Sequence, residues 1–220
     1  MAILFTDKLL LAVLRAILTD PEAVAPGAAS KLREPILRFT ELYRAFSASD
    51  LGGDGGIGDY MVVEAGFVSY AEAPLFSPTV FNFFTPSYAR PGPLLAAGLV
   101  SPEFQITNEY TIVLLSNQIE ASAYQYIDSA GVIHAGWDGY TTATSPSSVM
   151  LHTDAWESLA ADPATLVDNL NLVFMAGQLP DAMKATLVQY ISLIPSSSPA
   201  QRVVEGAYLV VSSPQFSIQQ

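Results

Sequence analysis

The residues best suited to ligand chemistry lie in one segment, residues 130–145, where aromatic, polar and acidic side chains alternate with glycine. The segment contains His134, Trp137, Asp138 and Tyr140. A flat aromatic ring can stack on a sugar, and a carboxylate between such rings can accept hydrogen bonds from hydroxyl groups. The sequence therefore predicts His134, Trp137 and Tyr140 as the ligand-binding residues of a carbohydrate-type site.

Carboxylates are the main catalytic groups that the chain offers. It has no cysteine and two histidines, and it lacks both a Gly-x-Ser-x-Gly nucleophile motif and a Gly-Lys-Ser/Thr phosphate loop. Hydrolysis of a polysaccharide requires two carboxyl groups about 5 to 10 Å apart. If the protein is an enzyme, we expect a glycosidase-type hydrolase that uses Asp138, Asp154 or Glu157.

Metal binding fits the histidines less well than an ordinary polar role does. His134 and His152 would need a third ligand, such as Asp138 or Asp154, and their spacing forms no i, i+4 pair on a helix. We therefore predict no metal site and no cofactor.

A glycine-rich segment, residues 49–59, presents Asp50, Asp54 and Asp59. Alternating carboxylates and glycines can wrap a calcium ion, but the spacing misses the EF-hand pattern. Glycine also loses the most conformational entropy on ordering. We expect a mobile excursion here rather than a calcium loop.

The charge balance excludes several partners. The chain has 21 Asp and Glu against 9 Lys and Arg, for a net charge of −12. Nucleic acids and anionic membrane surfaces are bound by clustered Lys and Arg, so neither is expected. Residues 3–18 are apolar but short and charged, and predict neither a membrane span nor a signal peptide.

The pattern of apolar residues and helix starts predicts an all-α fold. Half of the residues are hydrophobic and only 14% are charged, enough for one core in a single domain, residues 1–220. A Ser or Asp directly precedes Pro at several places, which is typical of a helix start. Among these pairs are Asp20-Pro21, Ser77-Pro78, Ser101-Pro102, Asp162-Pro163, Ser198-Pro199 and Ser213-Pro214.

Helical periodicity between these starts gives about seven or eight short helices. Three antiparallel helices are expected over residues 163–212, with Gly177 just past the first of them. The apolar pattern of residues 106–127 predicts a longer helix, which is apolar enough to lie at the centre of the domain. Further helices are expected at residues 3–18 and 35–48, and long irregular loops at 49–75 and 128–148.

The aromatic group Phe81, Phe83, Phe84 and Tyr88 has two interpretations. Adjacent aromatic residues around Pro86 could fill a corner of the core, which is the favoured interpretation. They could instead form a stacking platform for a ligand.

Several motifs, in this order, resemble one known family. They are residues 31–46 (KLREPILRFTELYRAF), 76–86 (FSPTVFNFFTP) and 99–109 (LVSPEFQITNE), followed by Asp162-Pro163, Asn171-Leu172, Gly177-Gln178-Leu179 and Ser213-Pro214-Gln215-Phe216. They resemble the C-terminal half of the bacterial family called domain of unknown function number 1800. The resemblance implies a longer parent chain with an export signal, hence a periplasmic or extracellular location. It also implies a partner from a second exported, sulfatase-like family.

Three function classes follow. The first is a helical, non-catalytic module of an exported bacterial protein that binds a protein partner or an envelope or extracellular polymer such as a carbohydrate. The second is the polysaccharide hydrolase. The third is a fragment whose chemistry lies elsewhere in a longer chain. The first class suits an acidic, apolar, motif-poor sequence best.

Overall fold

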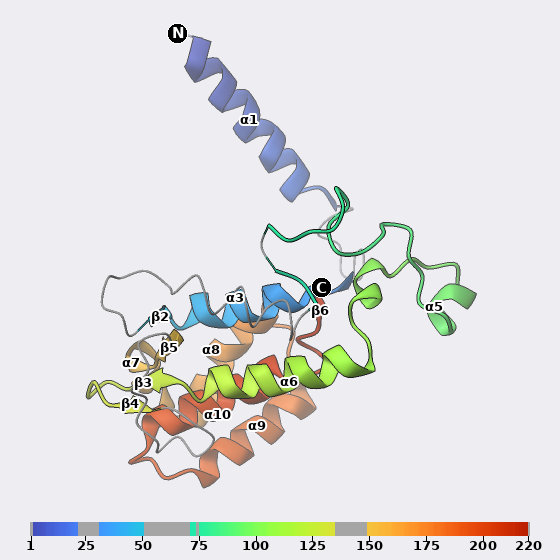
Figure 1. The fold of residues 1–220 in the computed structure, drawn as a ribbon. Coiled ribbons are helices and arrows are strands. Elements are labelled where there is room, and N and C mark those ends of the chain that lie inside the picture. Colours follow the sequence, from blue (N-terminus) through green and yellow to red (C-terminus); the bar gives the residue numbers. More distant parts are fainter. Residues whose placement is uncertain (1, 22–30, 51–70, 74, 135–148, 220) are drawn as a thin grey trace.

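The computed structural model describes residues 2–21, 31–50, 71–73, 75–134 and 149–219. Within these ranges the chain is mostly helical, and most of its short strands gather at one end of the helices (Figure 1). The α-helices are α1 (Ala2–Leu18), α3 (Pro35–Ala45), α5 (Pro93–Ala96), α6 (Glu109–Ala123), α7 (Asp154–Glu157), α8 (Pro163–Met175), α9 (Asp181–Leu193) and α10 (Pro199–Val211), and the 3-10 helices are η1 (Pro102–Gln105) and η2 (Leu159–Ala161). The predicted all-α fold class is confirmed, because helices predominate and the strands are short.

The C-terminal helices α8, α9 and α10 form the packed unit that the sequence predicted. Asp162 begins α8, and its carboxylate accepts hydrogen bonds from the backbone N–H groups of Ala164 and Thr165. The helix ends at a left-handed turn in which Gly177 has a φ of +82°, a conformation that glycine adopts without strain. Local sequence signals therefore fix both ends of α8.

Helix α10 is the centre of the domain, because it packs against α6, α7, α8 and α9. Its buried residues cover most of its circumference: Ala200, Arg202, Val203, Val204, Gly206, Ala207, Val210 and Val211. The prediction of a central helix within residues 106–127 is therefore wrong. In α6, Leu115 is buried, but Ile112 and Val113 are exposed.

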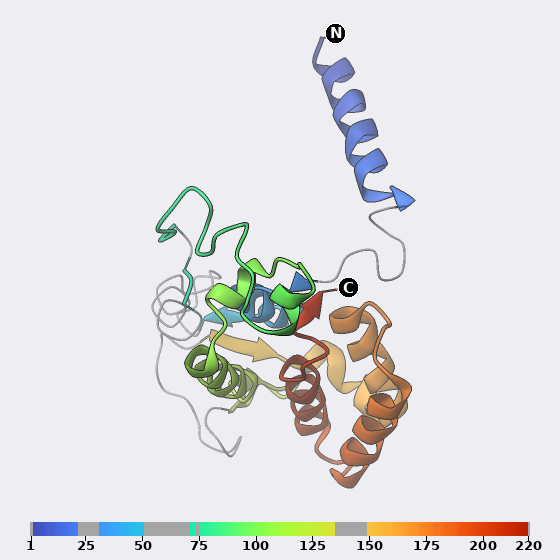
Figure 2. The same ribbon diagram turned by 90° about the vertical axis from the view of Figure 1, so that its right-hand side faces the viewer.

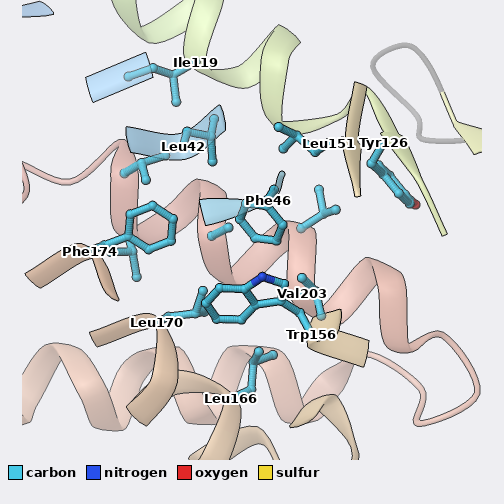
Figure 3. Packing of buried hydrophobic residues seen from close by; sticks show 14 of the residues in the cluster. Leu42, Phe46, Ile119, Tyr126, Leu151, Trp156, Leu166, Leu170, Phe174 and Val203 are labelled. Atoms are coloured by element: carbon cyan, nitrogen blue, oxygen red, sulfur yellow. The ribbon is translucent and has the colours of Figure 1, made fainter. Parts of the chain in front are cut away.

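Aromatic rings in the core connect α3 with α7 and α8 (Figure 3). Phe46, just after α3, stacks on Trp156 of α7 with ring centroids 5.1 Å apart, and lies 6.4 Å from the ring of Phe174 in α8. The indole N–H of Trp156 donates to the carbonyl of Ala45. These contacts connect α3 with α7 and α8.

Four short strands form a small sheet that the sequence analysis did not predict. Its order is β2 (Ser49–Asp50), β5 (Val149–His152), β3 (Tyr126–Ile127) and β4 (Ile133–His134). Strand β3 runs parallel to β5 and antiparallel to β4. The expected irregular loop at 128–148 is therefore ordered over its first residues, and residues 135–148 lie outside the described part of the chain. Most of the glycine-rich segment, residues 51–59, also lies outside it.

A second pairing joins the two ends of the packed domain. Strand β1 (Lys31–Leu32) is antiparallel to β6 (Ile218–Gln219). Arg33, directly after β1, lies over the ring of Phe216 at 4.2 Å from its centroid. The C-terminal segment is thereby fixed beside α3.

Helix α1 stands away from the packed domain in both views (Figures 1 and 2). Its apolar side chains from Leu9 to Leu18 are exposed. No helix among the described residues is long and apolar enough to cross a membrane.

The aromatic group at residues 81–88 does not fill the core, so the favoured interpretation was wrong. Phe81 is 62% exposed, and Phe83, Phe84 and Tyr88 are half-buried. The segment follows a turn at Ser77, whose hydroxyl donates to the carbonyl of Thr79. The Ser77-Pro78 pair thus begins a turn and not a helix.

Candidate functional site

One hollow, with a volume of about 510 Å³, lies between the end of α6, the β3–β4 hairpin, α7 and the start of α10. It is lined by Tyr124, Tyr126, Asp128, Ser129, His134, Glu157, Ser197, Ser198, Pro199, Ala200, Gln201, Val204 and Glu205. We call it the hairpin pocket. Its size lies within the range of small-ligand sites in proteins.

The turn of the β3–β4 hairpin is built by Asp128. Its Oδ1 accepts hydrogen bonds from the backbone N–H of Ala130, at 3.0 Å, and of Val132, at 2.8 Å. Gly131 takes a φ of +77°, which an L side chain would adopt only under strain. The sequence Asp-Ser-Ala-Gly therefore forms this turn by local chemistry.

The second oxygen of Asp128 fixes the ring of His134. Nε2 of His134 donates to Oδ2 of Asp128 at 3.0 Å. The imidazole also stacks on Tyr126, the residue opposite it in the hairpin, with centroids 4.4 Å apart and planes 10° from parallel. Partial burial acts to raise the pKa of Asp128, but the hydrogen bonds from His134 and from the turn N–H groups outweigh it and lower that pKa. Asp128 is therefore an ionised anchor at neutral pH.

Glu157 ties the hairpin to α7. One of its oxygens accepts from the backbone N–H of Ser129 at 2.8 Å and from the hydroxyl of Thr153 at 2.7 Å. Its other oxygen accepts a short hydrogen bond from the hydroxyl of Ser129. The side chain is buried, yet each of these partners is a neutral donor.

The opposite wall of the pocket carries Tyr124 and Glu205. Burial raises the pKa of the Tyr124 phenol above its usual range, and the charge of Glu205 adds to the increase. Glu205 also accepts a hydrogen bond from the hydroxyl of Tyr190 at 3.2 Å. The ring of Tyr124 packs at 5.6 Å on that of Tyr208. This wall therefore combines an aromatic ring with a carboxylate.

A family model described as Protein of unknown function (DUF1800) matches residues 3–218. The chain belongs to the DUF1800 family. No curated protein and no solved structure matches it.

Of the site residues that the sequence predicted for this DUF1800 chain, two line the hairpin pocket. His134 and Glu157 come together there from separate elements. Asp154 begins α7, is exposed and is not among the lining residues. Trp137, Asp138 and Tyr140 lie outside the described residues. The predicted roles of these residues in catalysis and ligand binding stay predictions.

The other eleven lining residues were not predicted as site residues from the sequence; Tyr124, Asp128, Ser129 and Glu205 are among them. A local signal was present for Asp128, because Asp followed three residues later by Gly is typical of a tight turn. Tyr124 and Glu205 belong to helix-rich segments that meet only in the folded chain, and their spacing carries no signal.

The two histidines do not share a site. His152 lies in β5, and its Nε2 is 2.7 Å from the hydroxyl of Ser49 in β2, whereas His134 contacts Asp128. Among the residues that the structure describes, no group of three or more His, Asp or Glu side chains is placed to hold a metal ion.

Proposed function

We propose that this DUF1800 chain is a non-catalytic binding module that takes sugar units of an envelope or extracellular polymer into the hairpin pocket. The observation that supports this most directly is the composition of the pocket. Carboxylates, hydroxyls and one amide line it beside aromatic rings. Sugars present hydroxyl donors around an apolar ring face, and such a lining offers both kinds of contact.

The pocket is also arranged before any ligand enters. Asp128 is fixed by the hairpin turn and Glu157 by Ser129 and Thr153. A binding site whose polar groups are already ordered loses less entropy when it takes a ligand. This preorganisation favours recognition of a defined polar ligand.

The same contacts favour binding over hydrolysis. A glycosidase needs one carboxyl group that is protonated and able to donate to the leaving oxygen. Asp128 has a lowered pKa and is bonded to His134, and both oxygens of Glu157 already accept hydrogen bonds. The hydrolase therefore stays the alternative, with Asp138, Asp154 and Glu157 as its candidate residues.

The proposal includes an exported location, periplasmic or extracellular, as expected for a protein that meets such polymers. Cell fractionation with an antibody to the native chain tests this separately. Recovery only in the cytoplasm would contradict it.

Binding is tested by titration calorimetry of the purified chain against a panel of bacterial and plant oligosaccharides. Tyr124→Ala should weaken binding at least about tenfold, because it removes a ring from the pocket wall. Tyr110→Ala is the matched control, since Tyr110 lies at the other end of α6 and is exposed. It should bind like the wild type.

Two results would contradict the proposed role as a non-catalytic binding module. Absence of binding to every member of the panel would remove its basis. Release of new reducing ends from any polysaccharide, abolished in Glu157→Gln, would establish the hydrolase instead.

A further inference from the structure

The lining of the hairpin pocket has more acidic than basic side chains, and a neutral sugar does not require this excess. Asp128, Glu157 and Glu205 all line it, and no Lys or Arg is among its lining residues in the described part of the chain. Only Asp128 has a basic partner there, which is His134. Three acidic groups thus share one hollow with a single imidazole.

In the described part of the chain, Glu157 and Glu205 accept hydrogen bonds from neutral donors. Glu157 is held by the backbone N–H and hydroxyl of Ser129 and by the hydroxyl of Thr153. Glu205 is held by the hydroxyl of Tyr190. Within the described ranges, neither carboxylate takes part in an ion pair; the pairs present there lie elsewhere or involve Asp128.

Neutral donors leave most of the negative potential in place. A carboxylate in a partly enclosed hollow interacts with a cation more strongly than one in open solvent, because the local dielectric constant is lower. A positively charged ligand therefore suits this lining better than a neutral one.

We propose that the sugar units bound by the hairpin pocket are amino sugars with a free, protonated amine, such as glucosamine. This rests on the proposed carbohydrate-binding function and names its substrate class. An ammonium group has three donors and no acceptor, which matches a lining rich in carboxylate acceptors. The ring hydroxyls of the same sugar suit Gln201 and the serines at the start of α10.

The test compares three tetrasaccharides with the same β-1,4 linkage and different groups at carbon 2: glucosamine, N-acetylglucosamine and glucose. Calorimetry should show the glucosamine form binding about tenfold or more tightly than the other two, with an affinity that falls as salt is added. Equal affinity for all three would overturn the amino-sugar inference and leave the proposed function intact. Failure of all three to bind would overturn both.

A pair of variants separates the pocket from the overall charge of −12. Glu205→Gln removes one charge from the pocket, and Glu109→Gln removes one from an exposed position at the start of α6. We expect Glu205→Gln to weaken glucosamine tetrasaccharide binding about tenfold and Glu109→Gln to leave it nearly unchanged. An equal effect of the two variants would assign the preference to non-specific attraction and overturn the inference.

Discussion

The guanidinium group of Arg202 closes the carbonyl end of α9 at Ile194. Nε and Nη2 both donate to the carbonyl oxygen of Ile194, at 2.9 and 2.7 Å, and Nη1 donates to the carbonyl of Ala160 at 2.8 Å. A positive group at this place also complements the negative end of the helix. One buried side chain of α10 therefore holds α9 and η2 together.

Replacing Arg202 by Met should destabilise the fold by about 2 to 4 kcal/mol, because two buried carbonyl groups lose their donors. Urea denaturation followed by circular dichroism measures the loss. Arg15→Met is the control, since Arg15 is exposed on α1, and it should change the free energy of unfolding by less than about 0.5 kcal/mol. Equal stability of the two variants would show that these hydrogen bonds contribute little.

At Gly206, α10 packs closely against α8 and α9. A Cβ atom at this position would lie 2.8 Å from Cδ1 of Leu170 and 3.0 Å from Cδ1 of Ile191. Ala is the better helix former in isolation, but here overpacking should outweigh that gain. We expect Gly206→Ala to destabilise the protein by about 1 to 2 kcal/mol in the same urea experiment. A variant that is more stable than the wild type would contradict this packing.

Ala207 lies on the same helix and is 1% exposed. Ala207→Asp would place an unpaired carboxylate inside the core, so the free energy of unfolding should fall by several kcal/mol. Thermal melting followed by circular dichroism shows the effect. A midpoint within a degree or two of the wild type would mean that α8, α9 and α10 are not packed as described.

The helices could be predicted from the sequence because their signals are local. Asp162 before Pro163 and Gly177 after α8 specify the ends of that helix by hydrogen bonding and by backbone conformation. The central position of α10 could not be read in this way. The apolar run at Ile112 looked more buried than it is, because burial depends on which face meets another element.

The pocket was predictable only in part, for the same reason. His134 was selected for the chemistry of its ring and Glu157 for its carboxylate, but nothing in their spacing of 23 residues brings them together. Their meeting depends on β3 pairing in parallel with β5, which places the hairpin beside α7. Strands of two to four residues carry too little pattern to be recognised from sequence.

Glu72 is a buried carboxylate beside the N-terminus of α3. It is 2% exposed, and its Oε1 accepts from the backbone N–H of Ile36 at 2.5 Å. The pKa of Glu72 is raised to about 7, chiefly by burial. The charge of Glu34 also raises this pKa, whereas the hydrogen bond from Ile36 and the charge of Lys31 lower it. The folded protein therefore holds a proton on Glu72 at mildly acidic pH.

The sign of the pH effect follows from this raised pKa. Because the folded-state pKa exceeds that of the unfolded chain, the proton on Glu72 stabilises the fold fully below about pH 4.5, and the stabilisation is lost as pH rises through about 7. Between about pH 5 and pH 8 the wild type should lose about 2 to 3 kcal/mol more stability than Glu72→Gln, which stays neutral. Urea denaturation of both proteins at the two pH values gives this difference, and the other titrating groups cancel in it. If the free energy of unfolding changes equally in the two proteins between these pH values, Glu72 is already ionised in the folded state.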